Sequence, residues 1–314
     1  MPIDPLTLAA MSGLVSGLVG GCVNPFVSRT MKYGARWLSD RFSGHPREAI
    51  EAAQRNAVNF YGQVNICLDG LQHIEGFEEK KDQALSDPDY TSLFQEAVLG
   101  AARVNSEQKH RLLARLVTDR LTAEPDSLRN LAAHMACNAV PQLSNTHLKL
   151  LGALYVIHHH LPPLELLRLP HDERIDVGTR WFLNEMAPYI PIGEITDLDL
   201  AHLIAVSCIT YVPQPTETNP FLIGVDEPNC WKLSIVVHNK FAPHVELYHF
   251  PMTAKLPQIE QNEIGVYLLN AWENTDMRKA SLTPAGSLIG LYVRDSYSIE
   301  PNLPDQVGAL PESI

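Results

Sequence analysis

The sequence lacks the features that usually mark nucleic-acid-binding proteins and nucleotide-dependent enzymes. Its 24 lysine and arginine residues are outnumbered by 36 aspartates and glutamates, which gives a formal net charge of −12 at pH 7. Because a protein that binds DNA or RNA usually carries an excess of basic residues, this balance argues against nucleic-acid binding. The chain also has no GxxxxGK(S/T) phosphate loop, no GxGxxG after a strand and no GxSxG turn around a serine nucleophile. We therefore predict no cofactor.

The cysteines and the N-terminal residues indicate the cellular compartment in which the protein is expected. Five cysteines are spread along the chain, and none of them forms a CxxC pair: Cys22, Cys67, Cys137, Cys208 and Cys230. This distribution is typical of reduced, buried thiols. No lysine or arginine precedes the first apolar run, and Asp4 lies where a secretory signal needs positive charge. We predict a cytoplasmic protein, with a peripheral or anchored position at the inner membrane as the alternative.

Three histidine-containing clusters are candidates for metal binding or catalysis. The side chains of His158–His160, if helical, point about 100° apart and cannot converge on one metal, so a helix end explains them better. His171–Glu173 is typical of a solvated turn. His244–Glu246 has the His-x-Glu spacing of zinc deaminases, but the Pro-Cys-x-x-Cys partner is missing and Cys230 stands alone upstream. We therefore predict no metal site and assign no catalytic residue.

What the sequence does have is a long uncharged leader. No charged residue occurs from Pro5 to Ser28, a span of 24 positions that is long enough to cross a bilayer as a helix. Small residues recur at helical spacing within it and form one stripe: Ser12, Gly13, Ser16, Gly17, Gly20 and Gly21. Such stripes let two helix backbones approach closely, so we expect self-association or a protein partner here.

Basic and aromatic residues follow the leader, and the flank comprises Lys32, Tyr33, Arg36 and Trp37. Residues of these types mark the water interface of many membrane segments, so residues 5–42 are a candidate membrane contact. The alternative is a soluble packing helix, because each interior glycine costs about 1 kcal/mol in a water-exposed helix and therefore needs close packing. Residues 1–44 are assigned to the leader and its flank.

The rest of the chain predicts a mainly α fold, a helical bundle followed by a smaller α+β region. Residues 45–161 carry apolar positions at spacings of three and four, which indicate about five helices. Asp87-Pro88 and Ser106 are predicted helix starts, and capping explains Asp87 and Asp89 better than acid–base chemistry. Ser144 is predicted to cap the last of these helices.

Residues 162–300 read as the α+β region. The segment ITDLDLAHLIAVSCITYV predicts one helix, with Asp197 in its first turn. The segments FLIGV, CWKLSIVVHNK and HVELYHF predict strands, and a short helix is expected to start at Thr283 with Pro284 first. Residues 301–314 are predicted to be a loose tail.

The region from Asp87 to Leu154 carries a family resemblance, on the stretch DPDYTSLFQEAVLGAARVNSEQKHRLLARLVTDRL and on NAVPQLSNTHLKLLGALYVIHH, which continues to His159. Together with Leu282, Thr283 and Gly286, they resemble an uncharacterised family of bacterial helical proteins known by locus names. The resemblance implies a helical bacterial protein, often encoded by an accessory gene, and it is consistent with a role in phage defence. It implies no activity and no catalytic residue. The leader and the strands near residues 220–250 depart from the family pattern.

The sequence therefore predicts a non-enzymatic bacterial interaction protein. It would act as a sensor or membrane-acting component of an anti-phage defence system, through oligomerisation or a partner protein. A hydrolase or nuclease with an unrecognised active site is one alternative. A soluble scaffold protein without a membrane role is the other.

Overall fold

The computed structural model describes residues 24–123, 127–159, 185, 187–189, 195–211, 221–227, 230–237, 246–252 and 280–298. Helices dominate this part of the chain, and strands are few and short. The prediction of a mainly α protein with a smaller α+β region is confirmed.

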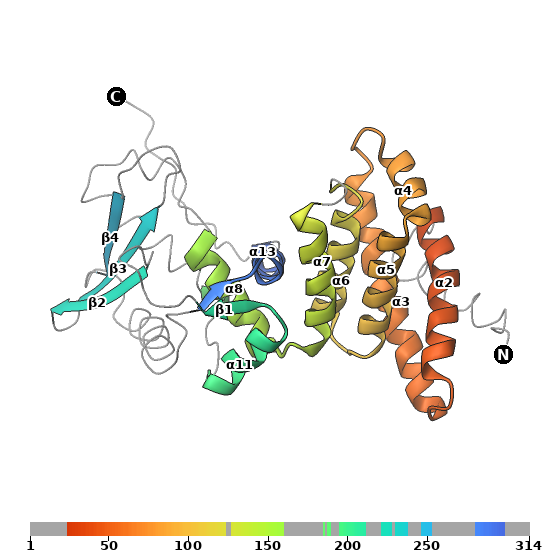
Figure 1. Ribbon diagram of the computed structural model, residues 1–314, viewed down its shortest axis with the longest axis horizontal. Helices are drawn as coiled ribbons and strands as arrows, with labels where there is room; N and C mark the ends of the chain where they lie inside the picture. Colours follow the sequence, from red (N-terminus) through yellow and green to blue (C-terminus); the bar gives the residue numbers. More distant parts are fainter. Residues whose placement is uncertain are drawn as a thin grey trace, which may run out of the picture.

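Six helices form the N-terminal bundle and stand side by side in Figure 1. They are α2 (Pro25–Phe42), α3 (Arg47–Leu71), α4 (Phe77–Ser86), α5 (Pro88–Ala102), α6 (Glu107–Asp119) and α7 (Leu128–Ala139). The long helix α3 contacts α2, α5 and α6, and α5 also contacts α7. The bundle is therefore built around α3 and α5.

Predicted capping residues fix several helix starts. The Asp87 side chain accepts a hydrogen bond from the Asp89 N–H at 2.9 Å, and Pro88 is the first residue of α5. Ser106 Oγ accepts from the Lys109 N–H at 3.4 Å. Two helices, α3 and α4, form between residues 47 and 86, because Gly76 adopts φ 70°, a left-handed conformation that ends the turn after α3 and directly precedes α4.

A cluster of aromatic rings fills the centre of the bundle. Phe94 lies 5.8 to 6.4 Å, centroid to centroid, from the rings of four neighbours on α2, α3 and α5: Phe26, Phe60, Tyr61 and Tyr90. All five side chains are at most 4 % exposed, so they belong to the core rather than to its rim. Because Phe26 belongs to α2, the core extends N-terminal to the boundary expected at residue 45.

The chain continues through the 3-10 turn η1 (Val140–Gln142) into a C-terminal unit. Its elements are α8 (Asn145–His159), η2 (Ala187–Tyr189), α11 (Asp197–Ala205), β1 (Ile209–Tyr211), β5 (Ala280–Leu282) and α13 (Pro284–Ser298). The predicted cap Ser144 accepts from the His147 N–H at 3.1 Å. The helix expected through residue 212 is shorter than predicted, because Ser207 has φ 60° and the β-branched Ile209 and Thr210 pair as strand.

Strands β1 and β5 form a two-stranded antiparallel sheet. Ile209 pairs with Leu282, and Tyr211 pairs with Ala280. The chain between these strands includes β2 (Phe221–Glu227), β3 (Cys230–Val237) and β4 (Glu246–Met252), which form an antiparallel sheet in that order. The three predicted strands are thereby confirmed, and Figure 1 places this sheet at the opposite end of the molecule from α2.

Glycines bring α13 close to its neighbours. A Cβ on Gly286 would overlap the Cys208 carbonyl, and a Cβ on Gly290 would lie 2.6 Å from the Leu151 carbonyl oxygen of α8. Because Gly286 and Gly290 lie one helical turn apart, both contacts are on one face of α13. Helix α13 also contacts α7, which joins the C-terminal unit to the bundle.

Within these ranges, no helix has both the length and the apolar character that a membrane span requires.

Candidate interaction surface

The predicted flank lies on the outer face of α2. Lys32, Tyr33 and Arg36 are exposed, and Trp37 is half-buried. The Tyr33 side chain is 55 % exposed although its ring stacks on Trp37, with centroids 6.2 Å apart and planes inclined by 24°. The structure therefore brings these four predicted residues together on one helix face, which we call the outer face of α2.

The inner face of α2 packs into the core of the bundle and fixes the orientation of the outer face. Val27, Met31 and Leu38 are buried at helical spacing. Gly34 lies against the Tyr61 hydroxyl of α3, and that hydroxyl donates to the Thr30 carbonyl at 3.0 Å. The outer face is therefore presented by a helix whose other side belongs to the core.

The charges of α2 differ in sign from those of the whole chain. The helix contains four cations, Arg29, Lys32, Arg36 and Arg41, and one anion, Asp40. Arg29 pairs with Asp82 of α4 at 2.9 Å. Lys32, Arg36 and Arg41 make no ion pair within the described part of the chain. The outer face thus combines uncompensated positive charge with two aromatic rings.

The glycine stripe of the leader lies outside the described residues. This applies to all six predicted packing positions: Ser12, Gly13, Ser16, Gly17, Gly20 and Gly21. The same holds for His160, for His171–Glu173 and for the side chains of His158 and Glu246.

A histidine pair at the junction of α8 and α11 is a candidate catalytic site, which would be an alternative to a binding surface. His147 Nδ1 accepts from the Ser144 N–H at 3.1 Å, so Nε2 carries the proton and donates to Asp199 Oδ1 at 3.0 Å. The His202 ring stacks on His147 at 5.0 Å, and its Nε2 lies 3.2 Å from the Gln142 carbonyl oxygen. Both nitrogens of His147 are therefore engaged in fastening α11 to α8, and neither is available as a general base.

A serine–histidine pair between α8 and α13 is a second alternative. Ser287 Oγ lies 3.1 Å from His159 Nε2, and burial lowers the pKa of His159, which favours the neutral ring that accepts a proton. A hydrolase also needs donors for an oxyanion. The Ser287 N–H bonds the Thr283 carbonyl at 2.8 Å, and the Gly286 N–H bonds Thr283 Oγ1 at 3.1 Å. Both of these amides are already bonded within the first turn of α13, so neither is free to bind an oxyanion.

Thiols and metal ligands give no further site among the residues that the structure describes. Burial raises the pKa of Cys67 and Cys137, and it raises the pKa of Cys208 to about 12. A nucleophilic cysteine needs a lowered pKa instead. No group of three or more histidine, cysteine, aspartate or glutamate side chains in the described ranges could hold a metal ion.

A polar network between the bundle and α13 was not predicted from the sequence. The Tyr292 hydroxyl donates to Asp119, which also accepts from Arg129 at 3.2 Å. Arg115 donates to Asp295 at 2.9 Å and lies over the Tyr292 ring, 4.3 Å from its centroid. Because Asp119 and Tyr292 are 173 residues apart, no local pattern could have revealed this network.

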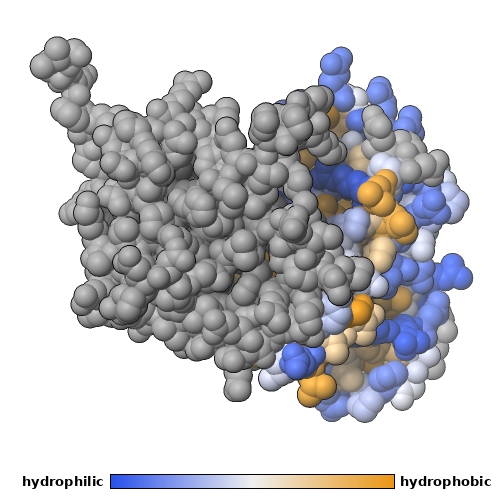
Figure 2. All heavy atoms as spheres, turned by 60° about the vertical axis from the view of Figure 1, so that its left-hand side comes forward, coloured by the Kyte–Doolittle hydropathy of each residue, from blue (hydrophilic) through white to orange (hydrophobic). Residues whose placement is uncertain are grey.

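Exposed apolar residues form a second surface feature. Leu128 and Leu131 on α7 are 67 % and 58 % exposed, and the half-buried Met135 continues their line. Figure 2 shows apolar residues at the surface of the bundle among mostly hydrophilic ones. Leu128, Leu131 and Met135 are all uncharged, and no described residue beside them points to a particular binding partner.

Comparison with known proteins identifies the family but no activity. A protein-family model matches residues 25–223, well over half of the chain. The match begins at the first residue of α2 and ends within β2, so it contains the outer face of α2 and leaves out residues 1–24, which include the glycine stripe. No curated protein and no solved structure matches the chain. The chain therefore belongs to this uncharacterised family, whose matched region is the helical bundle and the first part of the C-terminal unit.

Proposed function

We propose that the protein acts by binding rather than by chemistry, and that the outer face of α2 is its contact surface. The observation that carries the proposal is the arrangement of Lys32 and Arg36 beside the stacked rings of Tyr33 and Trp37. Arginine and aromatic side chains are enriched at the energetic centres of interfaces. A helix anchored by its inner face presents them with little loss of conformational entropy on binding.

The chemistry of the other polar clusters supports the same proposal. His147 uses both ring nitrogens in structural hydrogen bonds, and the amides next to Ser287 are used inside α13. Enzymes instead keep a base, a nucleophile and a charge-stabilising group free to meet the substrate. The hydrolase or nuclease alternative therefore has less support than binding.

Self-association through the leader is the second part of the proposal. Close backbone packing along Gly13, Gly17 and Gly21 would join leaders of several chains. We expect Gly17→Leu to block this packing by bulk, and Leu14→Ile to serve as the matched control. Light scattering after size-exclusion chromatography should show an oligomer that Gly17→Leu dissociates. A monomeric wild type would overturn this part, and a soluble scaffold would then be the simpler account.

The biological setting we propose is bacterial immunity, as a sensor or membrane-acting component of an anti-phage system. The resemblance of the Asp87–Leu154 region supports this setting. The test is phage challenge of bacteria that carry the gene alone or with its gene neighbour. Protection that needs the neighbour favours a sensor with a separate effector, and no protection against a broad phage panel contradicts the setting.

One pair of variants tests the contact surface in that assay. Lys32→Gln/Arg36→Gln removes two charges from the outer face of α2. The matched control Arg55→Gln/Arg103→Gln removes two exposed charges elsewhere on the bundle. We expect the first variant to lose protection and the control to keep it, at equal protein levels. Equal protection by both variants would contradict the proposed surface.

A further inference from the structure

We infer that the occupant of the outer face of α2 is the anionic headgroup region of a phospholipid membrane. The inference rests on the proposed function, because it names the partner of the same surface. It describes a peripheral contact in which α2 stays in the bundle and lies along the membrane surface.

Charge complementarity is the first argument. Lys32 and Arg36 lie on the outer face of α2 without ion-pair partners in the described part of the chain, and Asp40 is the one anion of the helix, although the chain as a whole has a net charge of −12. Each cation near an anionic bilayer strengthens binding roughly fivefold, so these two cations favour the bound state by on the order of 25-fold. A neutral bilayer offers no such gain, and the acidic remainder of the protein is repelled from an anionic one.

The aromatic pair is the second argument. Tyrosine and tryptophan are enriched at the level of the headgroups, where the ring contacts apolar chains and the polar atom remains in water. Tyr33 and Trp37 lie one turn apart, stack on each other and are interleaved with Lys32 and Arg36. An acidic protein would satisfy the cations as well as a lipid does, so the choice between them needs a third observation.

The position of α2 in the chain supplies that observation. Residues Pro5 to Ser28 contain no charged side chain, and the cations of α2 follow directly. The Asn24 N–H donates to Asn65 Oδ1 of α3 at 3.0 Å, and the Asn24 side chain caps α2. The point from which the uncharged leader departs is therefore fixed to the bundle at the start of α2. An uncharged segment followed by basic and aromatic residues is the order found at membrane interfaces.

The test uses the full-length protein and sedimentation with vesicles. One set of vesicles contains phosphatidylcholine only, and the other contains about 30 mol % phosphatidylglycerol, an anionic lipid. We expect the wild type to prefer the anionic vesicles at least tenfold and to lose that preference in about 0.5 M salt, which screens surface charge. Lys32→Gln/Arg36→Gln should weaken anionic binding by on the order of 25-fold.

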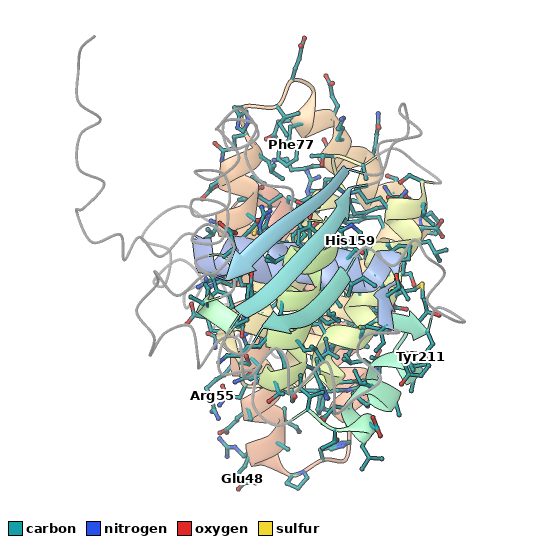
Figure 3. The ribbon with its side chains drawn as sticks, turned by 90° about the vertical axis from the view of Figure 1, so that its left-hand side faces the viewer. Glu48, Arg55, Phe77, His159 and Tyr211 are labelled. Atoms are coloured by element: carbon teal, nitrogen blue, oxygen red, sulfur yellow. The ribbon has the colours of Figure 1, made fainter. Side chains whose placement is uncertain are left out.

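The matched control separates α2 from overall charge. Arg55 lies on α3, as labelled in Figure 3, and Arg103 is exposed at the end of α5. Arg55→Gln/Arg103→Gln should bind anionic vesicles within twofold of the wild type. Equal weakening by both double variants, or equal wild-type binding to both kinds of vesicle, would overturn the inference. All three proteins must show the same circular dichroism and unfolding temperature.

Failure of the inference and failure of the proposed function give different results. If no vesicle is bound but Lys32→Gln/Arg36→Gln still abolishes phage protection, the surface binds an acidic protein and the lipid inference is wrong. If that variant protects as well as the Arg55→Gln/Arg103→Gln control, the proposed contact surface itself is wrong.

Discussion

The N-terminal bundle and the C-terminal unit are held together by different kinds of contact. In the bundle, the side chains of α2, α3 and α5 meet around Phe94, ring against ring. In the C-terminal unit, α13 approaches the carbonyls of Cys208 and Leu151 through Gly286 and Gly290. A contact between side chains can adjust by rotation, whereas a contact onto backbone cannot. We therefore expect the two regions to respond differently to the same size of change.

The largest effect is expected in the ring cluster. Phe94→Ala removes a side chain that is 1 % exposed and contacts four other rings, so it leaves a cavity. We expect a loss of about 4 kcal/mol in the free energy of unfolding, measured by urea titration. A loss below about 1 kcal/mol would mean that the bundle core is not packed around this ring.

The next largest loss of stability should come from a change beside the β1–β5 sheet. In Gly286→Ala the new methyl overlaps the carbonyl of Cys208, the residue directly before strand β1, and β1 is paired with β5. We expect destabilisation by about 3 kcal/mol, a large value for adding one methyl group. Gly100→Ala in the bundle is the comparison, because its methyl meets only the half-buried ring of Pro141, whose Cγ would be 2.6 Å away. Equal losses for both variants would contradict the distinction between the two regions.

A smaller loss of stability should follow from removing a hydrogen bond between the bundle and the C-terminal unit. Tyr292→Phe removes the hydroxyl that donates to Asp119 but leaves the Arg129–Asp119 pair in place. We expect a loss of about 2 kcal/mol, since hydrogen bonds to charged groups contribute more than neutral ones. Separate unfolding transitions for bundle and C-terminal unit in this variant would show that the network couples them.

The smallest effect has the opposite sign. Gly62 and Gly70 lie inside α3, and a Cβ at either position meets no atom within 4 Å. Replacing Gly62 by alanine should therefore stabilise the protein by about 0.5 to 1 kcal/mol, through a less flexible unfolded chain and better helix propensity. A destabilising result in thermal unfolding would show that the glycines of α3 are also contact positions.

Local signals in the sequence predicted the helix starts and strands well. Asp87-Pro88, Ser106 and Ser144 act within one helical turn, so each could be recognised without knowing the fold. The flank Lys32, Tyr33, Arg36 and Trp37 was also named from sequence, because basic and aromatic residues follow an uncharged span there.

Contacts between distant residues were missed. The Gly286-xxx-Gly290 spacing resembles that of the leader stripe, but only the fold places it against α8 and Cys208. The Asp119–Tyr292 bond joins α6 to α13. The inner face of α2 belongs to the same core as α5, because Phe26 contacts Tyr90 and Phe94. Phe26 was assigned to the leader, because an apolar helix face that meets a core has the same residue pattern as one that meets lipid.

The claim that the protein works through the outer face of α2 is tested most directly by photo-crosslinking in living bacteria. A photoreactive amino acid replaces Tyr33 in one strain and Arg55 in a control strain, and both positions are exposed. We predict crosslinked adducts from position 33, absent from position 55, which fall by on the order of 25-fold when Lys32 and Arg36 are both changed to glutamine. Adducts of equal amount from both positions, or adducts at position 33 that are unchanged without Lys32 and Arg36, would contradict the account.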